Sequence, residues 1–165
     1  MTYRTQLRQL AGNHHGIITT EQGRSHGIPP GAFRRLASAG ALRRISHGVY
    51  QHLEVPVTHL TKYAAALACV GKDSWIGAQS ALAMMGLERS WYPHIHVHIS
   101  GKLRKEVPEF VDVAEYSGMP PRAVTEYRGL RTVSAASIFA RRPDSSWKRA
   151  QMRRASEMGL LHPPS

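Results

Sequence analysis

Glycine and proline cut the first 54 residues into short segments, and this punctuation limits the possible folds more than any other feature of the sequence. The apolar spacing predicts a helix over residues 2–12. An extended pair, Ile17-Ile18, comes next. Thr19 and Gln22 then stand three residues apart, as in a helix-capping box. A short second helix is therefore expected, ending near His26-Gly27.

A third helix is predicted from the Pro29-Pro30 pair to Gly40, because proline fits well in the first turn of a helix. Three apolar side chains recur on one side of it, at the spacing of a core-facing stripe: Phe33, Leu36 and Ala37. The other side carries small and basic residues, with Arg34 on its flank: Gly31, Arg35 and Ser38. The solvent side of this helix is therefore expected to be basic.

Residues 41–53 read as two strands around a turn at Ser46-His47-Gly48. This order of elements is that of a winged helix-turn-helix, whose last helix enters the DNA major groove. We expect Arg34 and Arg35 to contact bases, since arginine binds guanine through two atoms, and the wing to hold phosphates. Exposed arginine pairs also occur on ordinary soluble surfaces, but two pairs on adjacent elements favour DNA. The candidate DNA-binding residues are Arg24, Gly31, Arg34, Arg35, Ser38, Arg43, Arg44 and His47.

The overall charge agrees with a polyanionic partner. The chain holds 22 Lys and Arg against 11 Asp and Glu, a formal net charge of +11. Such a balance favours nucleic acid or an anionic surface over a small substrate. Cys69 is the single cysteine, which excludes an internal disulfide and fits a reducing compartment. Without an apolar run of about 20 residues or a signal-peptide core, we expect a cytoplasmic protein that does not enter a membrane.

The remaining residues predict a small mixed α/β domain. An apolar helix capped by Thr58 is followed by a second one that ends at Gly86. Strict alternation predicts a strand over residues 94–100, and another strand is expected over residues 109–116. A hairpin or bend around Gly129 and two final helices complete the chain. The expected fold class is α+β, with a winged helix-turn-helix over residues 1–54 and the mixed α/β domain over residues 55–165.

The stretch from Leu10 to Pro56 resembles the N-terminal domain of the AbiEi family of type IV antitoxins. The motifs that carry the resemblance are GIITT, GIPPGAFRRLASAGAL and RISHGVY. The second half is similar more loosely, through GAQSALAMMGL, IHVHIS and GLRTVSAASIFA. The resemblance implies a bacterial transcriptional repressor that binds double-stranded DNA at its own promoter and counters a nucleotidyltransferase-like toxin. Where the family pattern has Arg before Gly-Val-Tyr, this chain has His47, a weaker phosphate contact near pH 7.

Three histidines alternate along the predicted strand: His94, His96 and His98. Side chains two apart on a strand share a face about 6.6 Å apart, so two neighbours can share a zinc ion but all three cannot easily do so. A further ligand would come from elsewhere: His14, His15, Cys69 or Asp112. A solvated polar face over a buried aliphatic one is the favoured interpretation, and no metal or other cofactor is expected.

The C-terminal segment carries a second group of basic residues on a predicted helix: Lys148, Arg149, Arg153 and Arg154. They are typical equally of a solvated helix face and of a second surface for phosphate or an acidic toxin. The sequence contains no P-loop, no GxGxxG after a strand and no GxSxG, so we expect no catalytic residues and no enzyme.

Two functions remain open at this point, and an enzyme that acts on nucleic acid is kept only as an outsider. The first is a DNA-binding antitoxin that represses its own operon and counters a nucleotidyltransferase-like toxin. The second is a stand-alone winged-helix regulator whose second domain senses a ligand or a metal. Neither the operator sequence nor the oligomeric state follows from the residues.

Overall fold

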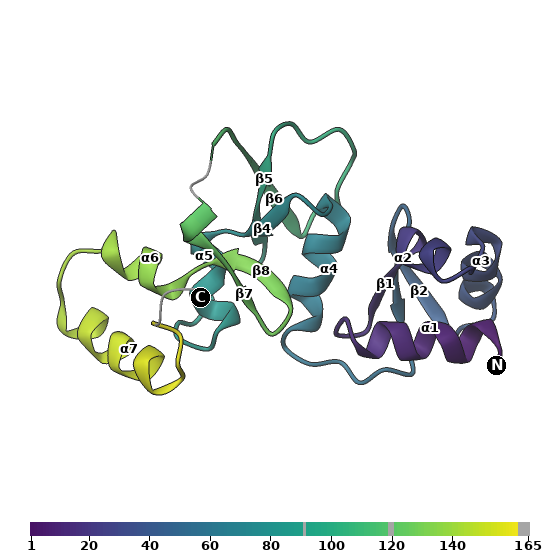
Figure 1. Cartoon of the computed structure of the whole chain (residues 1–165), viewed down its shortest axis with the longest axis horizontal. Helices are drawn as coiled ribbons and strands as arrows, with labels where there is room; N and C mark the ends of the chain where they lie inside the picture. Colours follow the sequence, from purple (N-terminus) through teal and green to yellow (C-terminus); the bar gives the residue numbers. More distant parts are fainter. Residues whose placement is uncertain (91, 119–120, 162–165) are drawn as a thin grey trace. The chain divides into compact units, whose positions relative to one another are not determined.

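The computed structural model describes residues 1–90, 92–118 and 121–161 (Figure 1). The chain forms two compact units, one of Met1–Lys72 with Lys105–Glu109 and one of Asp73–Arg104 with Phe110–Ser165. Both units combine helices with a sheet, so the α+β class is confirmed. The boundary that the sequence predicts after residue 54 falls inside the first unit, because one further helix packs there.

The first unit contains four helices and a three-stranded sheet. Its elements are α1 (Tyr3–Gly12), β1 (Ile17–Thr19), α2 (Thr20–Ser25), α3 (Pro30–Ser38), β2 (Leu42–Ser46), β3 (Val49–His52) and α4 (Thr61–Val70). The strands lie in the order β1-β3-β2, and both pairings are antiparallel. Helix, strand, helix, helix and hairpin therefore follow one another as a winged helix-turn-helix requires.

Local capping fixes where the short helices begin. Thr19 accepts a hydrogen bond from Gln22 N while the Gln22 side chain accepts one from Thr19 N, which confirms the predicted capping box. Pro30 occupies the first turn of α3, where its missing N–H is not needed. Gly23 of α2 is buried, and a Cβ there would lie 2.6 Å from Cε2 of Phe33. The close approach of α2 to α3 therefore requires glycine at this position.

The core of this unit lies between the sheet and the first three helices. It is formed by Leu7, Ala11, Ile18, Ile28, Ala32, Phe33, Leu42 and Tyr50. The rings of Phe33 and Tyr50 pack with their centroids 5.2 Å apart. Each large apolar side chain buried here contributes about 1.5–3 kcal/mol. This packing holds α3 in place and turns its polar side outward.

A buried histidine ties the end of the sheet to the first helix. His52 is 0 % exposed, and its Nδ1 accepts a hydrogen bond from Glu54 N at 3.3 Å. Its Nε2 therefore carries the proton and donates to the carbonyl oxygen of Arg4 at 3.2 Å. Arg4 in turn donates Nε to Glu54 Oε1 at 3.0 Å. Burial lowers the pKa of His52 below its ordinary value, so the neutral imidazole is favoured.

The fourth helix covers the other face of the three-stranded sheet. α4 contacts β1, β3 and β2, which is why it belongs to the first unit. The helix begins at Thr61 and not at Thr58, which corrects the predicted start. The Thr58 side chain accepts from Leu60 N within the preceding turn, and so it does not cap α4 itself.

The second unit is built around a five-stranded mixed sheet. Its elements are β4 (Ser74–Ile76), α5 (Ala78–Met84), β5 (Ile95–Ser100), β6 (Val111–Tyr116), η1 (Pro121–Ala123), β7 (Val124–Tyr127), β8 (Leu130–Val133), α6 (Ala135–Ala140) and α7 (Ser146–Glu157). The strand order is β6-β5-β4-β8-β7. Of the hairpin or bend expected around Gly129, the structure shows the hairpin, formed by β7 and β8 with Arg128 and Gly129 of its turn at positive φ. The short central strand β4 was not predicted.

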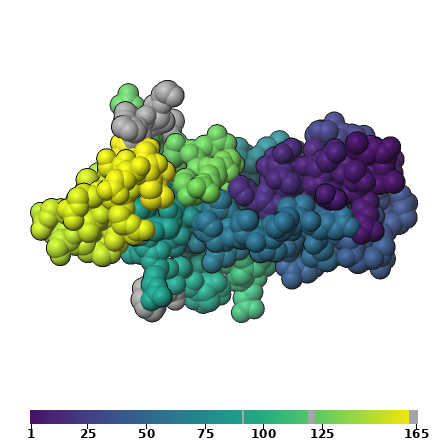
Figure 2. All heavy atoms as spheres, turned by 90° about the horizontal axis from the view of Figure 1, so that it is seen from below, coloured from purple at the N-terminus to yellow at the C-terminus, as the bar shows by residue number. Residues whose placement is uncertain are grey.

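The helices of this unit pack mainly through α5. α5 contacts β5, β8 and α6, and α6 contacts α7. Ser80 of α5 accepts a hydrogen bond from His96 N, which joins the helix to β5. Most of α7 is exposed and forms the yellow part of the surface in Figure 2, with Ala155 buried beneath it.

Candidate nucleic-acid interface

The solvent side of α3 carries the residues that the sequence predicts for it. Arg34, Arg35 and Ser38 are exposed and Gly31 is half-buried, whereas Ala32 and Phe33 of the same helix are buried. At 100° per residue the four form one stripe opposite the ring of Phe33. The core thus determines which side of α3 faces solvent.

Gly31 marks the point where the two arginines converge. A Cβ at this position would lie 3.7 Å from Nη2 of Arg34 and 3.7 Å from Nη1 of Arg35. Helical side chains lean toward the N-terminus of their helix, which brings both guanidinium groups back over the first turn. The result is two guanidinium groups that lie close to the helix backbone at a residue without a side chain of its own. Such a surface allows a close approach of a nucleic-acid groove.

The second arginine pair divides between the two faces of the three-stranded sheet. Arg44 pairs with Tyr50 across β2 and β3, and so lies on the face of the core and of α3. Arg43 pairs with Gln51 and lies on the opposite face, where its Nη2 donates to Gln51 Oε1 at 2.6 Å. Both side chains are exposed. Of this pair, Arg44 is the one placed on the same side as the helix.

The wing is short. β2 and β3 are joined through His47 and Gly48, and Gly48 adopts φ of 71°, a value that glycine accepts without strain. The Gly48 carbonyl accepts from Thr20 N at 2.9 Å, so the turn is fastened to the start of α2. His47 is exposed at the tip. Arg24 is also exposed, in the last turn of α2.

The charge of the chain is concentrated in this first part. Residues 1–72 contain nine Lys or Arg and two Glu, compared with thirteen and nine acidic residues in the remainder. The two glutamates pair with Arg4 and Lys72, and neither belongs to α3 or to the hairpin. α3 and the hairpin contain no Asp or Glu. The positive charge of their arginines is therefore not offset by an acidic side chain of the same elements.

Comparison with known families agrees with this geometry. Residues 6–51 match the family of AbiEi antitoxin transcriptional regulators. The chain carries an AbiEi-type N-terminal region. The match confirms the resemblance to that family, which is regulatory and not a class of enzymes. It runs from α1 into β3 and so contains α3 and the wing.

Other comparisons add little. No curated protein matches the chain. Among the residues that the structure describes, no helix is long and apolar enough to cross a membrane.

The basic residues outside the AbiEi-type region have a different setting. On α7, Lys148 Nζ donates to the Arg142 carbonyl at 2.8 Å, beyond the end of α6. Arg154 Nη2 donates to the Gly86 carbonyl at 3.0 Å, beyond the end of α5, and Arg149 pairs with Asp144 at 2.7 Å. Arg153 is exposed. Three of the four predicted residues therefore have contacts within their own unit, which favours a structural role for them.

Two of the strand histidines, His94 and His96, lie near Asp112, one of the further ligands that the sequence suggests. Asp112 Oδ2 lies 3.5 Å from His94 Nδ1 and 4.0 Å from His96 Nδ1. His98 turns instead to Tyr116, with stacked rings 5.3 Å apart. Within the described parts of the chain, no group of three or more His, Cys, Asp or Glu side chains is arranged to hold a metal ion. His14, His15 and Cys69 belong to the first unit.

Proposed function

We propose that this chain is a DNA-binding antitoxin that represses its own operon and counters a nucleotidyltransferase-like toxin in the cytoplasm. The observation that carries the proposal is the exposed stripe of α3, where Arg34 and Arg35 converge over Gly31. The match of residues 6–51 to a family of antitoxin regulators supports it independently.

The geometry suggests how DNA is held. α3 enters the major groove with its first turns against the base edges, and the guanidinium groups of Arg34 and Arg35 donate to guanine O6 and N7. Arg44 contacts a phosphate from the same side, and His47 reaches the backbone from the wing tip. Arg43 is held by Gln51 and contributes mainly to the field. Phosphate contacts of this kind make affinity fall with salt.

The test compares DNA from upstream of the gene with a scrambled duplex at several salt concentrations. Arg35→Ala is expected to cost about 1–3 kcal/mol on the upstream DNA and much less on the scrambled duplex. Arg44→Ala is expected to weaken both by a similar factor and to flatten the salt dependence by about one contact. Equal affinity of the unmodified protein for both duplexes would refute repression by specific binding.

Neutralisation of a toxin is tested separately. A nucleotidyltransferase-like reading frame beside the gene is expected, and co-expression with it should restore growth that the toxin alone arrests. The purified protein should show no nucleotide transfer or nucleic-acid cleavage of its own, because no nucleophile, base and orienting residue have been identified together. Reproducible turnover that is lost in His96→Ala would contradict this.

A stand-alone regulator with a ligand-sensing second unit is the other candidate. The observation that favours it is a cleft in the second unit, lined by Asp73, Trp75 and Arg131. The two candidates separate on the neighbouring gene: without a toxin-like reading frame beside it, the sensing function is preferred.

A further inference from the structure

β6 lies at one end of the five-stranded sheet, and no described strand pairs with its outer side. It pairs with β5 over all six of its residues without a bulge. Its exposed residues are Asp112, Ala114, Glu115 and Tyr116. Natural proteins often protect such an edge with Pro, Lys, a bulge or a very short strand, because a bare edge pairs readily with another strand. β6 has none of these features.

The hydrogen bonds to β5 determine which backbone groups of β6 point outward. Ile95 N donates to the carbonyl of Phe110, the residue directly before β6, at 2.8 Å. The bonding groups alternate along a paired strand, so even-numbered residues of β6 bond to β5 and odd-numbered residues point their N–H and C=O groups outward. The odd-numbered residues are Val111, Val113 and Glu115. No backbone hydrogen bond to these outward groups occurs in the described part of the chain, so the edge is open to a further strand.

We propose that this edge binds β6 of a second copy of the chain, antiparallel and about a twofold axis through Val113. In such a dimer each copy uses the same surface, which is the commonest arrangement of identical chains. The inference concerns the second unit and does not rest on the proposed DNA binding, so either can fail without the other.

The outward groups of both copies meet only in certain registers. A hydrogen-bonded antiparallel pair needs two residues whose N–H and C=O groups face each other, so odd-numbered residues must lie opposite odd-numbered ones. The twofold axis can therefore pass through a residue of β6 but not between two residues. An axis through Asp112 would place two carboxylates directly opposite each other, which is destabilising. An axis through Ala114 would pair Val113 with Glu115 and leave Val111 outside the strand pair.

An axis through Val113 uses every outward residue of the strand. Val113 lies opposite Val113 of the second copy, and Val111 lies opposite Glu115 on each side of the axis. Each of these pairs exchanges both of its N–H···O bonds, so the outward backbone groups are satisfied. Valine is also favoured in strands, because its branched side chain packs well against a neighbour across the pair.

The side chains on the other positions agree with this register. Asp112 lies opposite Ala114, so no carboxylate directly faces another. The two Asp112 side chains become diagonal neighbours about 7–8 Å apart, and each keeps its own His94 at 3.5 Å. Phe110 comes beside Tyr116 of the second copy, whose ring is exposed in the single chain. A pair of six-residue strands is smaller than a standard interface of about 800 Å² per partner, so we expect a weak, concentration-dependent dimer.

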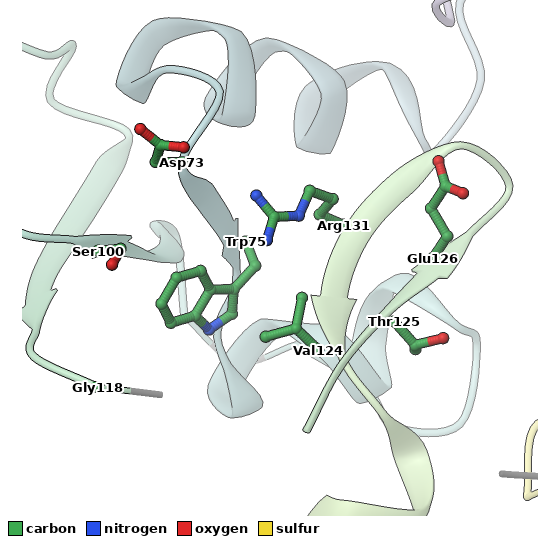
Figure 3. A pocket seen from close by; sticks show the side chains of 8 residues that line it. All are labelled: Asp73, Trp75, Ser100, Gly118, Val124, Thr125, Glu126 and Arg131. Carbon is green, nitrogen blue, oxygen red and sulfur yellow. The ribbon is translucent and has the colours of Figure 1, made fainter. Parts of the chain in front are cut away.

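The first test measures self-association of the full chain by analytical ultracentrifugation between about 1 and 500 µM, where a Kd of about 1–100 µM is expected. Ala114→Lys should strengthen the dimer about three- to thirtyfold, because it places a lysine opposite Asp112 twice in each dimer. Ala114→Asp should weaken it by a similar factor. Glu126→Gln is the matched control, since it changes the net charge by the same unit as Ala114→Lys but lies on β7, at the opposite edge of the sheet (Figure 3). It should leave the Kd unchanged.

Cysteine cross-linking tests the register itself. Residues of a hydrogen-bonded pair have Cα atoms about 5.5 Å apart, which suits a disulfide. Val113→Cys should therefore form a covalent dimer under mild oxidation. Ala114→Cys should not, because the two copies of Ala114 are diagonal neighbours about 7–8 Å apart. The unmodified chain is the control: its Cys69 is buried, and it should stay uncross-linked on a non-reducing gel.

The proposal is overturned if the chain stays monomeric at about 500 µM, a result that would leave the edge of β6 to a strand of another protein. It is also overturned if Ala114→Lys and Ala114→Asp change the Kd alike, since the contact between copies would then lie elsewhere. Faster cross-linking of Ala114→Cys than of Val113→Cys would contradict the axis through Val113.

Discussion

Replacing Gly31 with alanine should change stability and DNA affinity in opposite directions. Gly31 lies in the first turn of α3, where its φ is not positive, so alanine fits the backbone. The nearest atoms to an added Cβ are the two guanidinium nitrogens at 3.7 Å, an ordinary contact distance. Alanine in a helix is more stable than glycine by about 0.5–1 kcal/mol, because the unfolded chain loses less freedom. The variant should therefore be as stable as the parent or more so.

DNA affinity should fall in the same variant. The new methyl group occupies the space beside Gly31 on which the Arg34 and Arg35 side chains converge. A base edge that approaches this backbone would meet the methyl group, and the guanidinium groups would lose their position. One displaced bidentate contact to guanine corresponds to about 1–3 kcal/mol of discrimination. We expect a fall in affinity for the upstream DNA of roughly ten- to a hundredfold, with little change on a scrambled duplex.

Gly12→Ala provides the matched control. Gly12 is the last residue of α1 and is exposed, and a Cβ added there would have no atom within 4 Å. It should show a comparable gain in stability with unchanged DNA binding. Denaturant unfolding and fluorescence anisotropy on both duplexes measure the two effects. If Gly31→Ala binds the upstream DNA within twofold of the parent, the first turn of α3 does not approach the bases.

Four further predictions rest on single side chains. Arg43→Ala should weaken DNA binding less than Arg44→Ala, and equal effects of the two variants would contradict the assignment of sheet faces. His47→Arg should strengthen binding to all duplexes, because it adds a permanent charge. Fluorescence anisotropy at several salt concentrations measures the affinity of each variant. Burial raises the pKa of Cys69 to about 11 from 9.0, so its reaction with a thiol reagent at pH 8 should be about 100-fold slower in the folded protein than in urea, and equal rates would refute this. Because the pKa of His52 is lowered in the folded protein, the unfolded state binds a proton first as the pH falls. The contribution of His52 to stability is therefore fully present above about pH 6.5 and is lost as the pH falls below it. The slope of Tm against pH between 7 and 5 should be smaller in His52→Gln, and an unchanged slope would contradict this.

The first fifty residues were predictable because their signals are local. The capping pair Thr19 and Gln22, the proline that opens α3 and the turn at Gly48 each act within a few residues of themselves. The apolar stripe that includes Phe33 also lies within one helix. Such signals depend little on the rest of the fold, so reading them along the chain recovers the order of elements.

The second unit was harder because its centre is non-local. β4 has three residues, all buried, and lies between α4 and α5. In the sequence it is continuous with the apolar stretch that becomes α5, so the two read as a single helix. A strand buried on both faces shows no alternation, so its periodicity does not distinguish it from a helix. Its place becomes apparent only when it pairs with β5 and β8, residues that are far apart in the sequence. The cleft beside Trp75 depends on the same pairings, and no motif marks it.

The division between Arg43 and Arg44 shows what register adds to a sequence motif. Adjacent residues on a strand point to opposite faces, so a pair of arginines cannot act as a pair on one surface. Which of them faces α3 depends on whether Leu42 packs into the core, and that in turn follows from the alignment of β2 with β3. The sequence names both residues as candidates, and the register separates a side chain turned toward α3 from one that bonds to Gln51.

Net charge alone does not locate a nucleic-acid surface, because basic side chains also donate hydrogen bonds to carbonyl groups of the protein itself. The last carbonyl groups of a helix have no partner within it and carry partial negative charge. On α7, Lys148 and Arg154 donate to carbonyl groups just beyond the ends of α6 and α5, so their charge stabilises the second unit from within. On α3 the carbonyl-rich end lies at the opposite end from Gly31, and Arg34 and Arg35 lean away from it toward the N-terminus. Their charge is not used by the helix, and it is therefore available to a partner outside the chain.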